Sequence, residues 1–171
     1  MDINLNFTIC GRMLDFTVAD YFRWGFPNLW DGADHGTFTE FLVKTSLDSP
    51  ASPEGTMLIY YDGYSVATSA ASYLQSDDEA HPDHISFSCI PRRHRDPHPD
   101  VFVFCLFKAM SSGDTPTELS NWDFYIMSGE SIRDRETITL PSLISSSPVM
   151  TDFYGIASGI ENIIKSRLPG S

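Results

Sequence analysis

Seven consecutive apolar residues, Val101–Phe107 (VFVFCLF), constrain the fold of this chain more than any other feature. A run of this length, rich in valine and aromatic side chains, is typical of a strand that is buried on both faces. A strand that alternates apolar and polar residues would instead leave one face in water. We therefore expect Val101–Phe107 to lie inside a sheet that other elements cover on both sides.

The remaining pattern places further strands and helices around this run. Asp62-Gly63 is a two-residue hairpin signal between predicted strands at 56–61 and 64–68. Other strands, indicated by alternating apolar residues, are predicted at 4–10, 13–18, 85–90, 122–127 and 137–140. Helices are predicted at 19–30, 37–47 and 152–167, with a loop at 31–36. The order predicts a mixed α/β (α+β) fold with a central mixed sheet of about five strands, flanked by helices, in a single domain over 1–171.

The charge balance limits the partners of the chain. Eleven Lys and Arg residues against 23 Asp and Glu residues give a formal net charge of −12. Proteins that hold nucleic acid by its phosphates normally present a basic surface, so we expect weak nucleic-acid binding or none. The dense basic patch of Arg92, Arg93 and Arg95 is the candidate contact for nucleic acid or for an acidic partner.

The sequence also lacks the features of a secreted or membrane protein. No apolar run approaches the ~18 residues that cross a membrane, and the N-terminus has no basic start followed by an apolar segment. Cys10, Cys89 and Cys105 are odd in number and have no framework spacing, which indicates buried free thiols in a reducing compartment. We therefore predict a cytoplasmic protein with no membrane partner.

Four histidines, His81, His84, His94 and His98, lie close together in the sequence around Cys89. The spacings His81-x-x-His84 and His94-x-x-x-His98 resemble those of metal ligands. With a single cysteine nearby and a proline-rich context, these residues match no zinc motif. We interpret them as ordinary loop residues and predict no metal, with zinc binding as the open alternative.

Five short segments agree in order and spacing with a group of known proteins. They are Gly36–Val43, Ser72–Ser76, Asp100–Phe104, Trp122–Ile126 and Thr137–Leu143. Over roughly residues 20–145 they resemble bacterial proteins of the PD-(D/E)XK family. The resemblance implies a restriction-endonuclease-like core and, in active members, phosphodiester hydrolysis assisted by Mg²⁺. In those members a hairpin acid and the glutamate of a Glu-x-Lys strand hold the ion, while the lysine orients water or stabilises charge.

The same alignment leaves the catalytic positions of this chain degenerate. Ala67 takes the position of the strand glutamate, Ser69 that of the lysine and Met57 that of the hairpin acid. Mg²⁺ needs oxygen ligands, which alanine and methionine do not supply. The residual acids are Glu40, at the position of a helix glutamate of the family, and Asp62 in the hairpin turn. We therefore expect no catalytic residues and no cofactor.

These observations lead us to expect a catalytically inactive nuclease-fold protein that binds a protein partner. By analogy with the family, the partner is an active nuclease or a complex in phage defence or counter-defence, bound as a homo- or heterodimer. Tyr60, Tyr61 and Tyr64 surround the hairpin tip and are the candidate interface residues, because tyrosine is enriched in interface hot spots. Two alternatives remain: an active Mg²⁺-dependent DNA endonuclease with relocated ligands, and an acidic inhibitor that mimics DNA.

Overall fold

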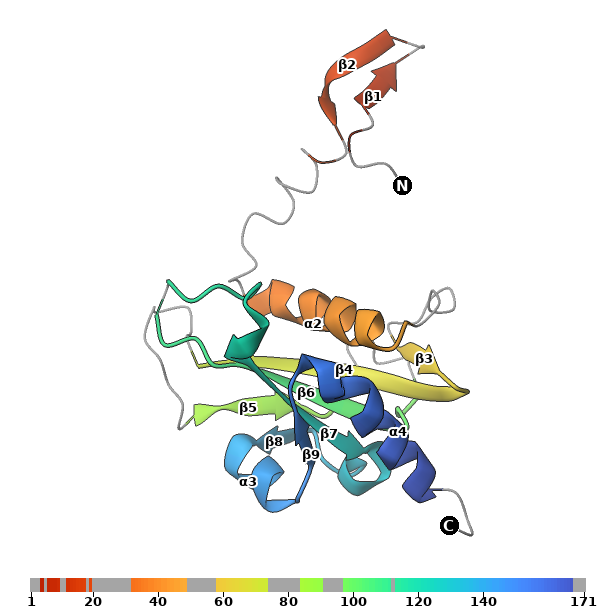
Figure 1. Cartoon of the computed structure of the whole chain (residues 1–171), viewed down its shortest axis with the longest axis vertical. Helices are drawn as coiled ribbons and strands as arrows, with labels where there is room; N and C mark the ends of the chain where they lie inside the picture. Colours follow the sequence, from red (N-terminus) through yellow and green to blue (C-terminus); the bar gives the residue numbers. More distant parts are fainter. Residues whose placement is uncertain are drawn as a thin grey trace.

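The computed structural model describes residues 4, 6–9, 12–17, 19, 32–48, 58–73, 84–90, 97–111 and 113–167. This part of the chain has the predicted mixed α/β fold, built around one mixed five-stranded sheet (Figure 1). The strand order in the sheet is β3-β4-β6-β7-β9. These strands are β3 (Ile59–Tyr61), β4 (Tyr64–Ser72), β6 (Val101–Phe107), β7 (Trp122–Ser128) and β9 (Val149–Thr151).

β6 is the central strand of this sheet, and the prediction from its apolar run is confirmed. β4 pairs with it in parallel and β7 pairs with it antiparallel. Every residue of β6 is at most 1% exposed. Its side chains alternate between two core clusters, with Val101, Val103, Cys105 and Phe107 on one face of the sheet and Phe102, Phe104 and Leu106 on the other.

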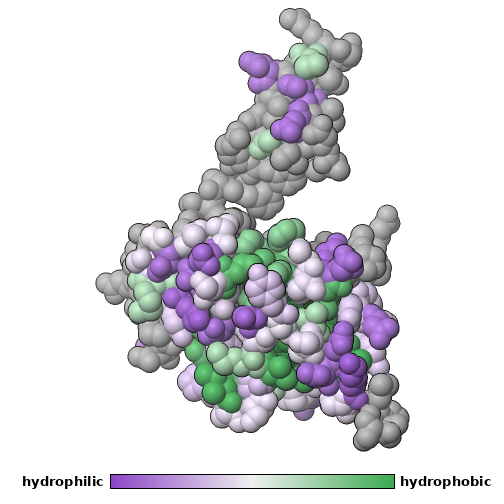
Figure 2. Space-filling model, viewed as in Figure 1, coloured by the Kyte–Doolittle hydropathy of each residue, from purple (hydrophilic) through white to green (hydrophobic). Residues whose placement is uncertain are grey.

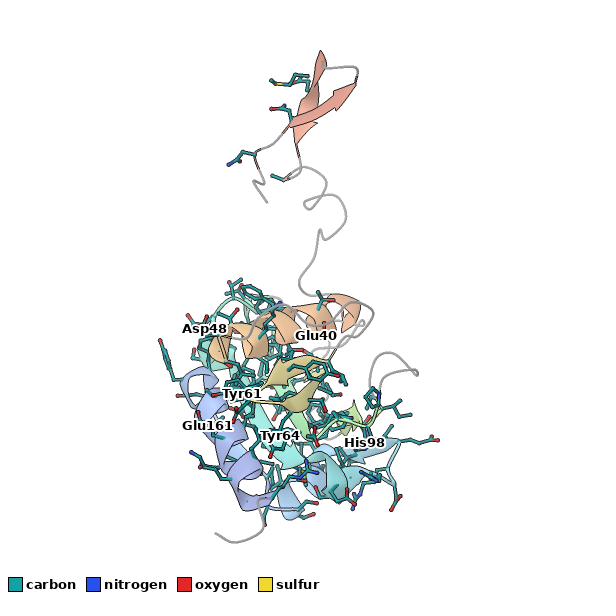
Figure 3. The ribbon with its side chains drawn as sticks, turned by 90° about the vertical axis from the view of Figure 1, so that its right-hand side faces the viewer. Glu40, Asp48, Tyr61, Tyr64, His98 and Glu161 are labelled. Carbon is teal, nitrogen blue, oxygen red and sulfur yellow. The ribbon has the colours of Figure 1, made fainter. Side chains whose placement is uncertain are left out.

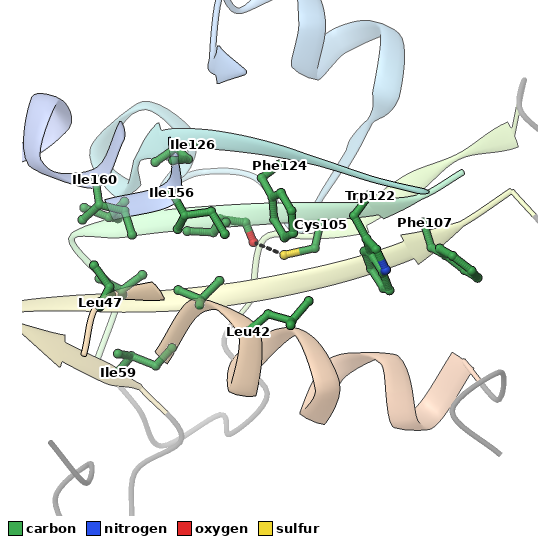
Figure 4. Close-up of a cluster of buried hydrophobic side chains, with 14 of the residues drawn as sticks. Leu42, Leu47, Ile59, Cys105, Phe107, Trp122, Phe124, Ile126, Ile156 and Ile160 are labelled. Carbon is green, nitrogen blue, oxygen red and sulfur yellow. Dashed lines mark hydrogen bonds between the residues drawn. The ribbon is translucent and has the colours of Figure 1, made fainter. Parts of the chain in front are cut away.

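Two different layers cover the two faces of the sheet. On the first face, which we call the helix face, α2 (Gly32–Ser46) and α4 (Ile156–Arg167) add leucine and isoleucine side chains to the cluster (Figure 4). On the opposite face, which we call the strand face, the cover consists of β5 (Ser86–Ser88), β8 (Thr137–Thr139) and α3 (Leu140–Ser145). β5 and β8 pair antiparallel in a small sheet of their own. The central strand is thus buried because both faces of its sheet are covered.

The hairpin predicted at Asp62-Gly63 is present, and two of the other predicted strands pair near the start of the chain. β3 and β4 pair antiparallel across Asp62 and Gly63, whose φ angles of 47° and 82° are those that an Asp-Gly turn provides. β1 (Asn6–Ile9) and β2 (Arg12–Thr17) pair antiparallel with each other. The helix predicted at 19–30 lies outside the described residues, apart from residue 19. Among the described segments, no helix has the length and apolar character needed to cross a bilayer.

Several element boundaries differ from the sequence prediction. α2 begins at Gly32, so the loop predicted at 31–36 is wrong over 32–36. Each glycine there costs the helix only about 1 kcal/mol, which is too little to end a helix of 15 residues. The strand predicted at 137–140 ends at Thr139, whose side chain accepts a hydrogen bond from the Ser142 amide (3.4 Å). Thr139 is therefore the N-cap of α3, a helix that the sequence reading did not predict. β9 was not predicted either.

A hydrogen-bonded network joins β4, β6 and α4 at one end of the sheet. The carboxylate of Asp100, directly before β6, accepts hydrogen bonds from the amide (3.0 Å) and the hydroxyl (2.8 Å) of Ser65. The Arg167 guanidinium in the last turn of α4 donates to the other carboxylate oxygen (3.1 Å). Burial alone raises the pKa of Asp100, but the bonds from Ser65 and the Arg167 charge outweigh it and lower this pKa below its ordinary value.

We expect Asp100→Asn to destabilise the protein by about 1 kcal/mol at neutral pH, a modest value because the Asp100 side chain is partly exposed. Because the folded-state pKa is lowered, the carboxylate contributes stability above its ordinary pKa and loses that contribution as the pH falls through the folded value. The difference between parent and variant in urea midpoint should therefore shrink as the solution is acidified. Asp62→Asn, at the exposed turn, is the control; equal effects of the two substitutions would contradict this role of Asp100.

Candidate functional site

Two of the positions that the family resemblance singles out lie in the interior of the protein. Ala67 and Ser69 are on β4, with 5% and 9% of their surface exposed. Being two residues apart on a strand, they point to the same side of the sheet. Their partners across the parallel ladder are Phe102 and Phe104 of β6, so this side is the strand face.

Aromatic side chains fill the space on the strand face next to these two positions. Phe102 and Phe104 stack with their ring centroids 5.6 Å apart. Phe87 of β5 meets Phe104 edge to face at 5.4 Å. Met57, the third position, lies outside the described residues, but its neighbour Leu58 is 1% exposed and belongs to the same cluster as Ala67. The described neighbours of these two positions are therefore apolar core.

The two residual acids lie away from Ala67 and Ser69. Glu40 is on α2, which packs on the helix face, so the sheet separates it from the strand face (Figure 3). Asp62 is exposed at the tip of the β3–β4 hairpin. Within the described segments, no three His, Cys, Asp or Glu side chains are grouped so that they could hold a metal ion. The fold therefore does not bring Glu40 and Asp62 together with the degenerate positions.

The three tyrosines of the hairpin are half-buried rather than free at its tip. Tyr60 packs against the cluster on the strand face, and Tyr61 and Tyr64 pack against the cluster on the helix face. The Tyr61 hydroxyl donates a hydrogen bond to a Glu161 oxygen of α4 (3.0 Å; Figure 3), and this bond raises the pKa of Tyr61. Lys165 donates to the other Glu161 oxygen (3.1 Å). These rings stabilise the fold, and only their outer parts are open to a partner.

The histidines and arginines of the sequence analysis lie mostly outside the described residues. This holds for His81, His94, Arg92, Arg93 and Arg95. His84 is exposed at the start of the segment that leads into β5. The His98 ring packs edge to face on Phe102 (5.9 Å), and its Nδ1 lies 3.1 Å from the Pro99 carbonyl oxygen.

The two described cysteines are buried free thiols, as expected for these residues. Cys89 is 2% exposed, and Cys105 lies within β6. Burial raises the pKa of both thiols, so both remain protonated at neutral pH. A protonated, buried thiol is neither a nucleophile nor a metal ligand.

A polar group that sequence reasoning missed lies near the carboxyl ends of β4 and β6. Lys108, just after β6, forms an ion pair with Asp123 of β7 (2.7 Å). Tyr125, two residues further along β7, is buried, and its burial together with the charge of Asp123 raises its pKa to about 12. Tyr125 therefore stays neutral, and the Lys108–Asp123 pair has no net charge. No sequence signal pointed to this group, because only the pairing of β6 with β7 brings its members together.

The described geometry thus has a buried alanine and a buried serine where the resemblance places a glutamate and a lysine. Comparison with known proteins does not extend this picture, since no protein family, curated protein or solved structure matches the chain.

Proposed function

We propose that this chain is a nuclease-fold protein without nuclease activity and that it acts by binding a protein partner. One observation carries the proposal: Ala67 and Ser69, which align with a catalytic glutamate and lysine, are buried against Phe102 and Phe104. A Mg²⁺ ion needs several oxygen ligands, usually including water, and apolar side chains supply neither. Metal-assisted hydrolysis would therefore have no centre on this face of β4.

The arrangement of the elements agrees with this proposal. α2, which carries Glu40, precedes the β3–β4 hairpin, and Ala67 and Ser69 lie on the second strand of that hairpin. Two positions on one face of this strand are where a Glu-x-Lys pair of the family would sit. Replacing such a pair by small uncharged side chains removes the cost of burying charges without their metal ion. The fold then keeps its core while the former site is filled.

A protein partner fits the charge of the chain better than a polyanion does. With a formal net charge of −12, the chain repels nucleic acid except at a local basic patch. The resemblance points to an active nuclease or a defence or counter-defence complex in the cytoplasm as the partner. Tight binding of duplex DNA or RNA at physiological salt would contradict this part of the proposal.

The direct test is a cleavage assay with supercoiled plasmid, linear duplex DNA and single-stranded RNA in Mg²⁺ or Mn²⁺. We expect no cleavage by the purified protein, because the aligned positions hold no metal ligands. A contaminating nuclease would act equally in preparations of every variant. Cleavage that disappears in Glu40→Gln or Asp62→Asn, but persists in the control Asp48→Asn, would show an active relocated site and overturn the proposal.

A further inference from the structure

β9 forms one edge of the five-stranded sheet. Its hydrogen-bonded neighbour is β7, and within the described part of the chain no strand lies on its other side. An edge strand presents a row of backbone donors and acceptors that can pair with another strand. Many edges are protected by charged side chains, but Val149–Thr151 carries none.

The segment that contains this edge exposes apolar side chains among uncharged serines. Of the seven large hydrophobic side chains that are exposed in the described residues, three lie here: Ile144 (54%), Met150 (61%) and Tyr154 (89%). Figure 2 shows hydrophobic side chains gathered at the lower left, over α3, the helix that leads into β9. No Asp, Glu, Lys or Arg occurs from residue 141 to residue 151, although the whole chain has a formal net charge of −12.

We propose that β9 pairs antiparallel with β9 of a second copy of this chain, which joins the two five-stranded sheets into one continuous sheet. A strand edge is complementary to itself in the antiparallel direction, because each copy offers the donors and acceptors that the other needs. Pairing about Met150 places Val149 opposite the second copy's Thr151. It places Asp152 opposite the second copy's Pro148, so that no two acidic side chains face each other.

The overall charge of the chain argues for this surface over others. Two copies with the same negative charge repel each other, and the repulsion is smallest where the approaching surfaces carry no charge.

Three-residue strands and a few apolar side chains make a small interface, so the association is weak. Because salt screens the repulsion between copies, the dimer should become tighter as ionic strength rises, the opposite of an interface held by ion pairs. This association is independent of the proposed function and stands whether or not the chain cleaves nucleic acid.

The first test is sedimentation of the full chain over a concentration series at low and high salt. We expect the dimer fraction to grow with both concentration and salt. Met150→Lys places on β9 the kind of charged side chain that protects natural edge strands from pairing. This substitution should weaken dimerisation about tenfold or more. Met110→Lys is the matched control, because Met110 is also 61% exposed but follows β6, which β7 separates from β9 in the sheet. This substitution should leave dimerisation within about twofold.

The second test fixes the register of the pairing. Facing residues in antiparallel strands have Cα atoms about 4.5–5.5 Å apart, which lies within the range of a disulfide bond. Met150→Cys, in a chain whose Cys10 is replaced by serine, should therefore form a disulfide-linked dimer on mild oxidation, and Met110→Cys should not. A monomer under all conditions would overturn the proposal. The proposal would also be overturned if the two lysine variants weakened the dimer equally, or if neither weakened it. It would be overturned as well if the Met150→Cys chain did not cross-link.

Discussion

Replacing Ala67 by glutamate is expected to remove a large part of the stability of the fold. Ala67 is 5% exposed and lies beside Phe102 on the strand face, where a carboxylate would find no charged partner in the apolar cluster. An uncompensated buried charge costs about 3–5 kcal/mol, a large part of the 5–15 kcal/mol that stabilises a typical domain. Burial would raise the pKa of the new glutamate, so the loss should be smallest at acidic pH and increase as the pH rises.

The measurement is urea unfolding of Ala67→Glu between pH 4 and pH 8, with and without millimolar Mg²⁺. Ala67→Met is the control for size, because it adds volume at the same site without charge and should cost about 1–3 kcal/mol with no pH dependence. Adding Ser69→Lys completes the Glu-x-Lys pair of the resemblance and tests whether the strand face can hold a metal ion. If Mg²⁺ returned the double variant to the parent's midpoint, the strand face would still hold a metal pocket, and the proposed loss of the nuclease site would be wrong.

The second large effect is expected from Gly129→Ala, directly after β7. A Cβ atom at Gly129 would overlap the Pro99 carbonyl oxygen and would lie 3.2 Å from Cε1 of His98. The Gly129 amide also donates a hydrogen bond to the Asp100 carbonyl oxygen (2.8 Å). Because the obstacle is backbone that is itself held in place, we expect a loss of about 3 kcal/mol.

Gly113→Ala provides the matched control for this substitution. Gly113 is exposed, and the Ser111 hydroxyl oxygen would lie at an ordinary contact distance of 3.5 Å from the new methyl group. The comparison is made on urea midpoints of the two variants and the parent. If Gly129→Ala lost no more stability than Gly113→Ala, residues 97–100 would not pack closely on the end of β7.

The sequence determined those elements whose signals are local. The run Val101–Phe107 predicted a strand buried on both faces, because its apolar character needs no knowledge of its neighbours. Asp62-Gly63 predicted the hairpin, because its backbone conformation is a property of two residues. The helical spacing at 37–47 and 152–167 predicted most of α2 and α4 for the same reason.

Short elements that form only against a neighbour were not predictable in this way. β9 has three residues, and it is a strand because it pairs with β7. α3 has six residues, too few to form a stable helix alone, and its apolar Leu140 and Leu143 are buried on the strand face. Propensity over so few residues is weaker than the burial that fixes them.

For the candidate site, the sequence placed Ala67 and Ser69 on a strand, two residues apart and so on a common side. Only the tertiary structure decided that this side meets Phe102 and Phe104 and that Glu40 lies across the sheet from it. A strand pattern tells which residues share a face, but the layer that covers that face comes from distant parts of the chain. Here the cover includes β5, β8 and α3, which follow β4 in the chain, so the burial of Ala67 and Ser69 is a property of the whole fold.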